Sequence, residues 1–144
     1  SVAIPFIYGS LAMNMIDINV LILSSAAFLS NTFREIIKGI LDIEGDKELG
    51  LATLPIKYGI EKSYLISSIF LIISLIVGFI PVIIHTITNL KTFIFLMIIA
   101  DILFIFSLVY PLYKSYEKHS ILTSKRVCLL GMLFGMLSFI FGVY

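Results

Sequence analysis

Residues with oxygen and charged side chains are concentrated in one stretch of this chain, residues 34–59. Four of the nine acidic residues fall within residues 42–48, and five of the ten basic residues within residues 34–62. Asp42 and Asp46 are four residues apart, which places both carboxylates on one face of a helical turn. Carboxylates this close favour a bound cation, and Mg²⁺ typically takes one or two carboxylates together with substrate phosphates. We therefore predict that Asp42 and Asp46 are catalytic metal ligands for Mg²⁺.

Basic side chains flank this pair on both sides. Arg34 and Lys38 precede it, four residues apart, while Lys47 and Lys57 follow. Arginine offers a planar fork to phosphate oxygens and lysine a point charge, so we predict that these four residues bind a diphosphate. Asn31 stands where the apolar part of the preceding helix ends, and it would either line the pocket or cap a neighbouring group.

The residue types restrict the chemistry. No histidine, serine or cysteine is placed near the acids as a nucleophile with its base. Carboxylates, a metal and cations beside apolar helices suit departure of diphosphate from an allylic lipid, because they stabilise the charge that develops on the leaving group. A calcium loop read from Asp42 fails, since Lys47 and Thr53 occupy its sixth and twelfth positions. On spacing alone, an ordinary cytoplasmic loop with solvated charges remains open.

The elements that position this stretch are membrane helices. The chain has 144 residues, of which 60% are hydrophobic, and its mean hydropathy is +1.11. Charged residues make up 13%, roughly half the share in a soluble domain. This composition predicts an all-α, multi-pass transmembrane bundle that forms a single domain over residues 1–144, and no nucleic-acid-binding pattern is present. The single cysteine, Cys128, excludes an internal disulfide framework.

Five apolar segments are predicted. The second segment, residues 20–33, is expected to continue as a helix through the charged turn 34–41. Residues 113–126 are expected to form a polar connection before the last segment. The first segment is short of the ~20 residues of a full span, and Ser1 is no initiator residue, so the chain is expected to be a fragment of a larger protein. The five segments are residues 2–15, 20–33, 64–84, 92–113 and 127–144.

The basic residues predict an orientation. Nine of the ten lie in the connections after the second and fourth segments, and Lys91 is the exception. These two connections are on the same side of the membrane, and cytoplasmic loops carry an excess of cations. The stretch 34–59 is therefore predicted to be a loop region on the cytoplasmic side of the cell membrane.

Two features lie within the spans. Asp101 is in the middle of a predicted span, where an ionised carboxylate is costly, so a helix-packing hydrogen bond is favoured over a substrate role. Gly131 and Gly135 form a GxxxG pattern, for which packing within the chain is favoured over dimerisation.

Taken as a string, REIIKGILDIEGDKELGLATLPIKYG resembles the second aspartate-rich region of the UbiA superfamily of intramembrane prenyltransferases. The resemblance implies the C-terminal part of a bundle of about nine membrane helices. It also implies that Asp42 and Asp46 hold Mg²⁺ bound to a prenyl diphosphate, with basic residues nearby holding the diphosphate. The positions in register with the family pattern are Arg34, Glu35, Lys38, Asp42, Gly45, Asp46, Gly50, Thr53, Leu54 and Pro55.

Two departures from the family pattern matter. Gly39 stands where the family often has an acid, and the first aspartate-rich region is missing. The N-terminal half is therefore an expected partner, and the segment alone is expected to be inactive.

Within the family, the chain is most similar to archaeal members that add a second geranylgeranyl chain to geranylgeranylglyceryl phosphate. An aromatic or quinone-precursor acceptor is the alternative. A fragment of a cation-coupled transporter is less favoured, because transporters place such acids near the bilayer midplane. A head-group phosphotransferase would need a D-G-x-x-A-R string, which is absent, and a purely structural membrane subunit is the remaining class.

Overall fold

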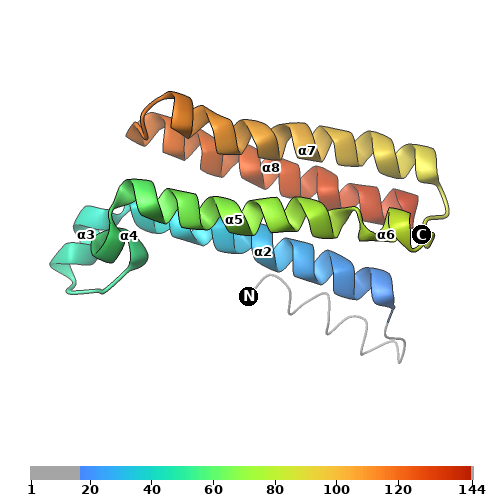
Figure 1. The fold of residues 1–144 in the computed structure, drawn as a ribbon, viewed down its shortest axis with the longest axis horizontal. Coiled ribbons are helices and arrows are strands. Elements are labelled where there is room, and N and C mark those ends of the chain that lie inside the picture. The colour runs from blue at the N-terminus through green and yellow to red at the C-terminus, as the bar shows by residue number, and fades with distance from the viewer. Residues whose placement is uncertain (1–16, 144) are drawn as a thin grey trace.

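The computed structural model describes residues 17–143, and every regular element in that range is an α-helix. Four long helices run alternately up and down, and two short helices project from one end of the bundle (Figure 1). A third short helix, α6, follows α5, and the bounds of the seven described helices are α2 (Ile18–Leu41), α3 (Ile43–Glu48), α4 (Leu54–Tyr58), α5 (Ile60–Gly78), α6 (Ile80–Ile83), α7 (Leu90–Tyr113) and α8 (Lys118–Gly142). The predicted first segment, residues 2–15, lies outside the described residues.

Four of the predicted membrane segments are confirmed as helices long and apolar enough to cross a bilayer. They are Ile18–Leu41, Ile60–Ile83, Leu90–Tyr113 and Lys118–Gly142. The second is interrupted at Phe79, where the chain passes from α5 to α6 and Pro81 lies in the first turn of the new helix. The all-α prediction therefore holds for the described part of the chain.

The bundle consists of two helix pairs, α2 with α5 and α7 with α8, which join chiefly through α2 and α8. The core near the charged end contains Phe33 of α2, Tyr64 of α5 and Cys128 of α8, all fully buried. The rings of Phe33 and Tyr64 meet edge to face, with centroids 6.2 Å apart. In a bilayer such close packing, rather than escape from water, holds helices together.

Glycines permit the closest approaches between helices. A methyl group at Gly131 of α8 would lie 2.7 Å from Phe104 Cε1 of α7, and one at Gly142 would lie 2.5 Å from Phe93 Cβ. The GxxxG pattern therefore packs within the chain at Gly131, as predicted. A methyl group at Gly135 would meet no atom within 4 Å, so the two glycines of the pattern differ in role.

The predicted polar connection over residues 113–126 is wrong for most of its length. Helix α8 begins at Lys118, and the turn after α7 is short, with Ser115 and Tyr116 at positive φ of 51° and 61°. The polar residues after Lys118 form helix because Ser124 packs against α7, where its hydroxyl donates to the Ser107 carbonyl at 2.7 Å. Low hydropathy marked the end of the apolar surface rather than the end of the helix.

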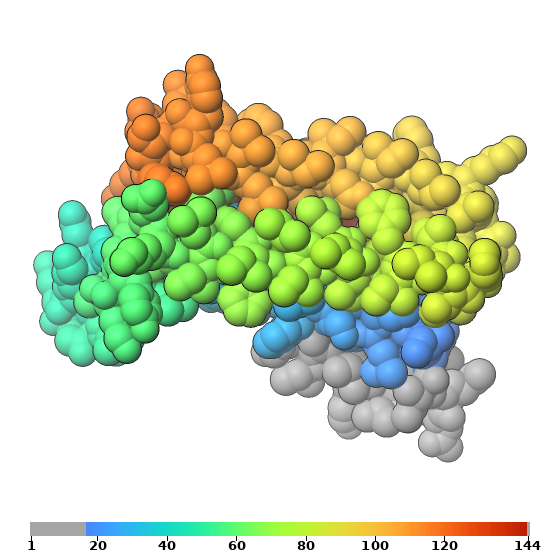
Figure 2. All heavy atoms as spheres, in the orientation of Figure 1, coloured from blue at the N-terminus to red at the C-terminus, as the bar shows by residue number. Residues whose placement is uncertain are grey.

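The connection that contains α3 and α4 and the turn between α7 and α8 lie at one end of the bundle (Figure 1). Helix α7, whose first turn contains Lys91, begins at the other end. The outward surfaces of α5 and α7 are apolar, with Ile76 65% and Ile102 61% exposed. Figure 2 shows this face, with α5 in green and α7 in yellow to orange. An all-apolar outer surface suits contact with lipid.

Candidate functional site

The acidic pair is positioned by a nearly continuous helical path from α2 into α3. The N–H of Asp42 donates to the Lys38 carbonyl at 3.1 Å, and the N–H of Asp46 donates to the Asp42 carbonyl at 2.9 Å. These bonds keep Asp42 and Asp46 one helical turn apart, as their spacing predicted. Asp42 itself is the break, with φ −102° and ψ 15°, whereas Gly45 lies inside α3.

A glycine ends α3 and turns the chain back toward α2. Gly50 has φ +68°, its N–H donates to the Lys47 carbonyl at 3.1 Å, and the Leu51 N–H donates to the Asp46 carbonyl at 2.9 Å. These two bonds are the Schellman arrangement of a helix C-terminus. The returning chain forms α4, whose Pro55 is buried and lies close enough to α2 that a methyl group at Gly39 would be 3.6 Å from Pro55 Cγ. The predicted loop region 34–59 is therefore mostly helix, formed by the end of α2 and by the short helices α3 and α4.

Four of the predicted site residues lie along one stripe of the α2 surface. Asn31, Arg34, Lys38 and Asp42 recur at intervals of three, four and four residues, which keeps them on one side of a helix. Arg34 Nη1 donates to Asn31 Oδ1 at 3.4 Å. Lys38 and Asp42 are exposed, and Asp46, one turn further, is half-buried. We refer to these five residues as the polar stripe.

Arg34 retains unused hydrogen-bonding capacity. Its Nε is buried and has no hydrogen-bond partner among the described residues. Its contact with Asn31 uses only one of the five guanidinium N–H groups. A buried donor without a partner is energetically costly. The Arg34 guanidinium is therefore suited to bind an anion, which would accept a hydrogen bond from Nε.

A groove of about 440 Å³ runs between α2 and the start of α4, beside the polar stripe. Asn31 lines this groove and also accepts from Arg34, and its role in substrate binding stays a prediction. Thr53 lines the groove as well, and its hydroxyl is buried without a partner among the described residues. The full lining is Phe28, Asn31, Thr32, Glu35, Ile36, Gly39, Thr53, Leu54 and Pro55.

Residue-by-residue reasoning overlooked Glu35 and Thr53. Both matched the family string, yet neither was given a role in the site. The match to the family string was the one sequence feature that could have pointed to both residues. A groove between two helices that are separated by a turn leaves no periodic pattern in the sequence.

The structure does not bring Lys47 and Lys57 onto the stripe. Lys47 directly follows Asp46 and is therefore turned by about 100° around α3, and its side chain is exposed. Lys57 is exposed on α4, where its Nζ lies 5.2 Å from the centroid of the Tyr58 ring. Their predicted diphosphate contacts remain predictions.

The donor set of the acidic pair fits a magnesium ion. Among the described residues, no group of three or more histidine, cysteine, aspartate or glutamate side chains forms a closed metal cage. Asp42 and Asp46 instead offer hard carboxylate oxygens on an accessible surface. Mg²⁺ commonly binds through one or two carboxylates and completes its shell with water and phosphate oxygens.

The turn between α7 and α8 lies at the same end of the bundle as the stripe. The Tyr116 ring meets the Tyr64 ring edge to face, with centroids 5.4 Å apart. Burial, and to a lesser degree the Glu61 carboxylate, raises the pKa of Tyr116.

Comparison with known proteins places this geometry among membrane prenyltransferases. Residues 1–130 match the UbiA prenyltransferase family. A digeranylgeranylglyceryl phosphate synthase of Methanosphaera stadtmanae is 34% identical over 139 residues, which are 96% of this chain and 50% of that protein. A synthase of the same name from Pyrococcus horikoshii is 49% identical over 76 residues, which are 53% of this chain and 27% of that protein.

A solved structure is also similar. It is described as giving structural and mechanistic insights into the biosynthesis of digeranylgeranylglyceryl phosphate synthase in membranes. It matches with a TM-score of 0.79 and 33% identity, over 87% of this chain and 43% of that chain. The chain thus spans about half the length, or less, of the relatives that it matches.

Proposed function

Because this chain belongs to the UbiA prenyltransferase family, we propose that it is the C-terminal half of a Mg²⁺-dependent prenyltransferase. The enzyme transfers a geranylgeranyl group from its diphosphate to geranylgeranylglyceryl phosphate, in archaeal ether-lipid synthesis. The N-terminal half of the same enzyme supplies the first aspartate-rich region. The observation that carries this proposal is the polar stripe, which combines two carboxylates with two cations along one helical path.

Each residue of the stripe has a part in holding the donor. Asp42 and Asp46 hold Mg²⁺, which when bound offsets the negative charge of the leaving diphosphate. Arg34 presents its free Nε and the remaining N–H groups to diphosphate oxygens, and Lys38 adds a point charge. Asn31 accepts from Arg34 and thereby orients the guanidinium. Lys47 and Lys57 act from the rim, as longer-range positive charges.

In this proposal, the groove beside the stripe binds the hydrocarbon part of the substrates. Phe28, Ile36 and Leu54 give it apolar walls, while Thr53 offers a hydroxyl within it. An apolar groove next to the diphosphate shelters the reacting allylic carbon from water. Thr53 is placed to hydrogen-bond a phosphate or hydroxyl oxygen of either substrate.

The acceptor assignment rests on relatives that are named for digeranylgeranylglyceryl phosphate synthesis. An aromatic or quinone-precursor acceptor is the alternative within the family. A cation-coupled transporter is disfavoured because the acidic pair lies at the end of the bundle, whereas transporters bind ions at broken helices near the bilayer midplane.

The stripe faces the cytoplasm in this proposal, and the protein resides in the cell membrane. Nine of the ten basic residues belong to the end of the bundle that carries the stripe. Cytoplasmic ends of membrane helices carry this excess of cations. Mg²⁺ and the charged phosphate groups of the two lipid substrates reach the site from that side.

The proposal is tested with the complete enzyme and radiolabelled geranylgeranyl diphosphate. The acceptor is either geranylgeranylglyceryl phosphate or 4-hydroxybenzoate, each with and without Mg²⁺. We expect label to pass to the glyceryl phosphate only, and only with Mg²⁺. Transfer to the aromatic acid alone would overturn the acceptor, and transfer that is insensitive to chelation of Mg²⁺ would overturn the metal role.

A further inference from the structure

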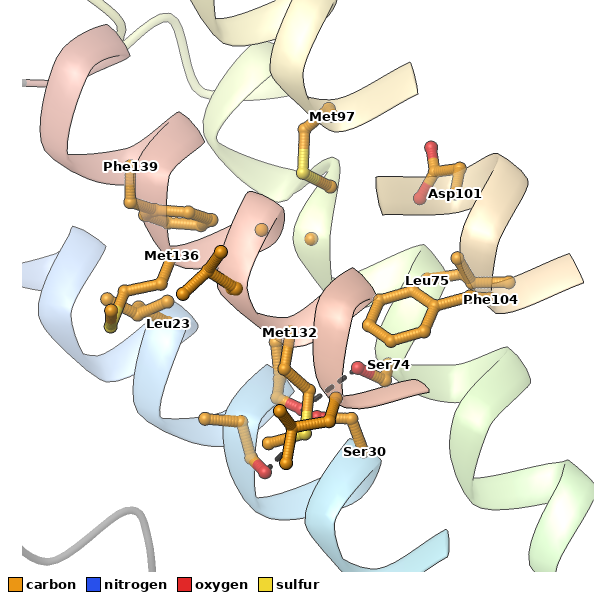
Figure 3. Close-up of a pocket in the computed structure, with 16 residues that line it drawn as sticks. Leu23, Ser30, Ser74, Leu75, Met97, Asp101, Phe104, Met132, Met136 and Phe139 are labelled. Atoms are coloured by element: carbon orange, nitrogen blue, oxygen red, sulfur yellow. Dashed lines mark hydrogen bonds between the residues drawn. The ribbon is translucent and has the colours of Figure 1, made fainter. Parts of the chain in front are cut away.

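A cavity of about 230 Å³ lies between α2, α5, α7 and α8 (Figure 3), and none of the polar-stripe residues lines it. It is larger than the cavity of about 150 Å³ that is enough to bind benzene. Its walls are almost wholly hydrocarbon and thioether. Three of the lining residues are methionines, whose side chains are unbranched and adaptable: Met97, Met132 and Met136.

The serine hydroxyls in these walls are already satisfied. Ser30 of α2 and Ser74 of α5 both donate to the Ala26 carbonyl, each at 2.9 Å. The bond from Ser74 ties α5 to α2, whereas the bond from Ser30 lies within α2. Dashed lines in Figure 3 mark hydrogen bonds of this kind between the lining residues. These two hydroxyls therefore do not need a hydrogen-bond partner from a molecule in the cavity.

Asp101 differs from the serines. It projects from α7 at the edge of the cavity (Figure 3), and its Oδ1 is buried with no hydrogen-bond partner among the described residues. It lies near the middle of a 24-residue helix, and so near the middle of the bilayer. A carboxylate there is costly, and no described residue that lines the cavity is a cation that could pair with it. The neutral acid fits this place, with one proton to donate.

Helices α5 and α7 meet at two places, one on each side of Asp101. These helices are tied near the charged end, where the Tyr64 hydroxyl donates to the Ser107 carbonyl at 2.8 Å. They also approach near the other end, where a methyl group at Gly78 would lie 2.6 Å from Met97 Cε. Asp101 lies between these two ties and is only half-buried. The neighbouring outer surface, including Ile102, is exposed and apolar.

We propose that this cavity is an intramembrane binding site for an uncharged hydrocarbon molecule with one oxygen acceptor, of the class of long-chain alcohols. The molecule enters from the bilayer between α5 and α7. Asp101 donates its proton to the oxygen, and the methionine walls adapt to the hydrocarbon chain. The cavity lining and the polar stripe share no residue, and the test of the cavity does not depend on prenyl transfer.

The test uses dicyclohexylcarbodiimide, which labels neutral carboxyl groups in apolar surroundings. The carboxyl oxygen bonds to the central carbodiimide carbon, the acid proton passes to a nitrogen, and rearrangement gives a stable N-acylurea that retains all atoms of both reactants. The complete protein in lipid nanodiscs is labelled with and without 1-decanol or decane, and adducts are located by mass spectrometry. We expect labelling of Asp101, slowed several-fold by decanol and less by decane at equal membrane concentration.

Variants separate the cavity from general effects on the membrane. Gly135→Phe fills the cavity, because Gly135 lines it and faces open space. We expect this change to reduce labelling of Asp101 several-fold and to remove the effect of decanol. Ile102→Phe adds similar bulk on the outer surface, where Ile102 is 61% exposed, and should label and respond as the wild type does. Asp101→Asn removes the adduct at this position.

Two results would overturn the proposal. One is an unlabelled Asp101 in the folded wild type. The other is labelling that neither decanol nor Gly135→Phe alters. If Gly135→Phe fails to fold, as judged by circular dichroism, the comparison of decanol with decane on the wild type decides the question.

Discussion

Helices α2 and α7 have the same length, 24 residues, yet they carry polar groups in opposite ways. Asn31, Arg34 and Lys38 of α2 lie on a stripe that leads out of the bundle to the acidic pair, where water and ions can reach them. Helix α7 has an apolar outer surface and one acid, Asp101, near its middle. Charge is tolerated at a membrane helix end, whereas a carboxyl at its centre needs a partner inside the protein.

The largest effect is expected from removing the acidic pair, to which the polar stripe of α2 leads. We expect Asp42→Ala and Asp46→Ala each to lower kcat for prenyl transfer by about 100-fold or more, since groups that stabilise charge in the transition state contribute on this scale. Radiolabel transfer at saturating Mg²⁺ measures the effect. Glu48→Gln, on an exposed position of α3, is the control and should remain within a few-fold of wild type. Wild-type rates in both alanine variants would contradict the site.

The second-largest effect is expected from disturbing the close packing of α7 on α8. It is measured as a change in the free energy of unfolding rather than in the reaction rate. Gly131→Leu places a side chain against the Phe104 ring and should destabilise the protein by about 1–3 kcal/mol, the usual cost of overpacking. Gly135→Leu is the matched control, because it points into open space. Thermal unfolding of the complete protein in detergent, followed by circular dichroism, compares the two. Equal losses in both variants would show that the two glycines have the same role.

The guanidinium of Arg34 should matter through its geometry as well as its charge. Arg34→Lys keeps the charge but removes Nε and the planar fork, so we expect KM for the prenyl diphosphate to rise about ten-fold, equivalent to ~1.4 kcal/mol. Steady-state kinetics at fixed Mg²⁺ measures this change. Lys62→Arg, an exposed residue at the same end of the bundle, should leave KM unaltered. An unchanged KM in Arg34→Lys would remove Arg34 from the diphosphate site.

The smallest expected effect concerns the turn after α3. Gly50 has a positive φ, so Gly50→Ala should cost about 1 kcal/mol of stability. Gly45→Ala has the opposite expectation, because Gly45 is inside α3 and alanine favours helix by roughly 0.5–1 kcal/mol. Thermal unfolding of the two variants under identical conditions gives the sign of each change. Destabilisation by Gly45→Ala alone would reverse our assignment of the break in the helix.

Much of this fold could be predicted because membrane helices are local features. Hydropathy located α2, α5 and α7 to within a few residues, and the cation count placed both charged connections at one end. The start of α8 was missed because its first turns are polar on the outside while Ser124 is buried against α7. That contact depends on a neighbouring helix and has no signature in hydropathy.

The candidate site divides in the same way. The spacing of Asp42 and Asp46, and of Arg34 and Lys38, was enough to align them, because helical periodicity converts spacing directly into a shared face. The different orientations of Lys47 and Lys57 depend on the Schellman turn at Gly50 and on the return of α4 to α2. The groove with Thr53 arises from the same return.

By itself, then, the sequence determined that this is a helical membrane protein with two carboxylates and two cations on one helical path. Composition and short spacings are sufficient for that, since both act within a single helix. Only the tertiary structure decided that the buried Arg34 Nε has no partner within residues 17–143, that Gly131 and Gly135 have different roles, and that Asp101 borders a cavity. Each of these depends on which surfaces of separate helices meet, and helix packing brings together residues far apart in the chain.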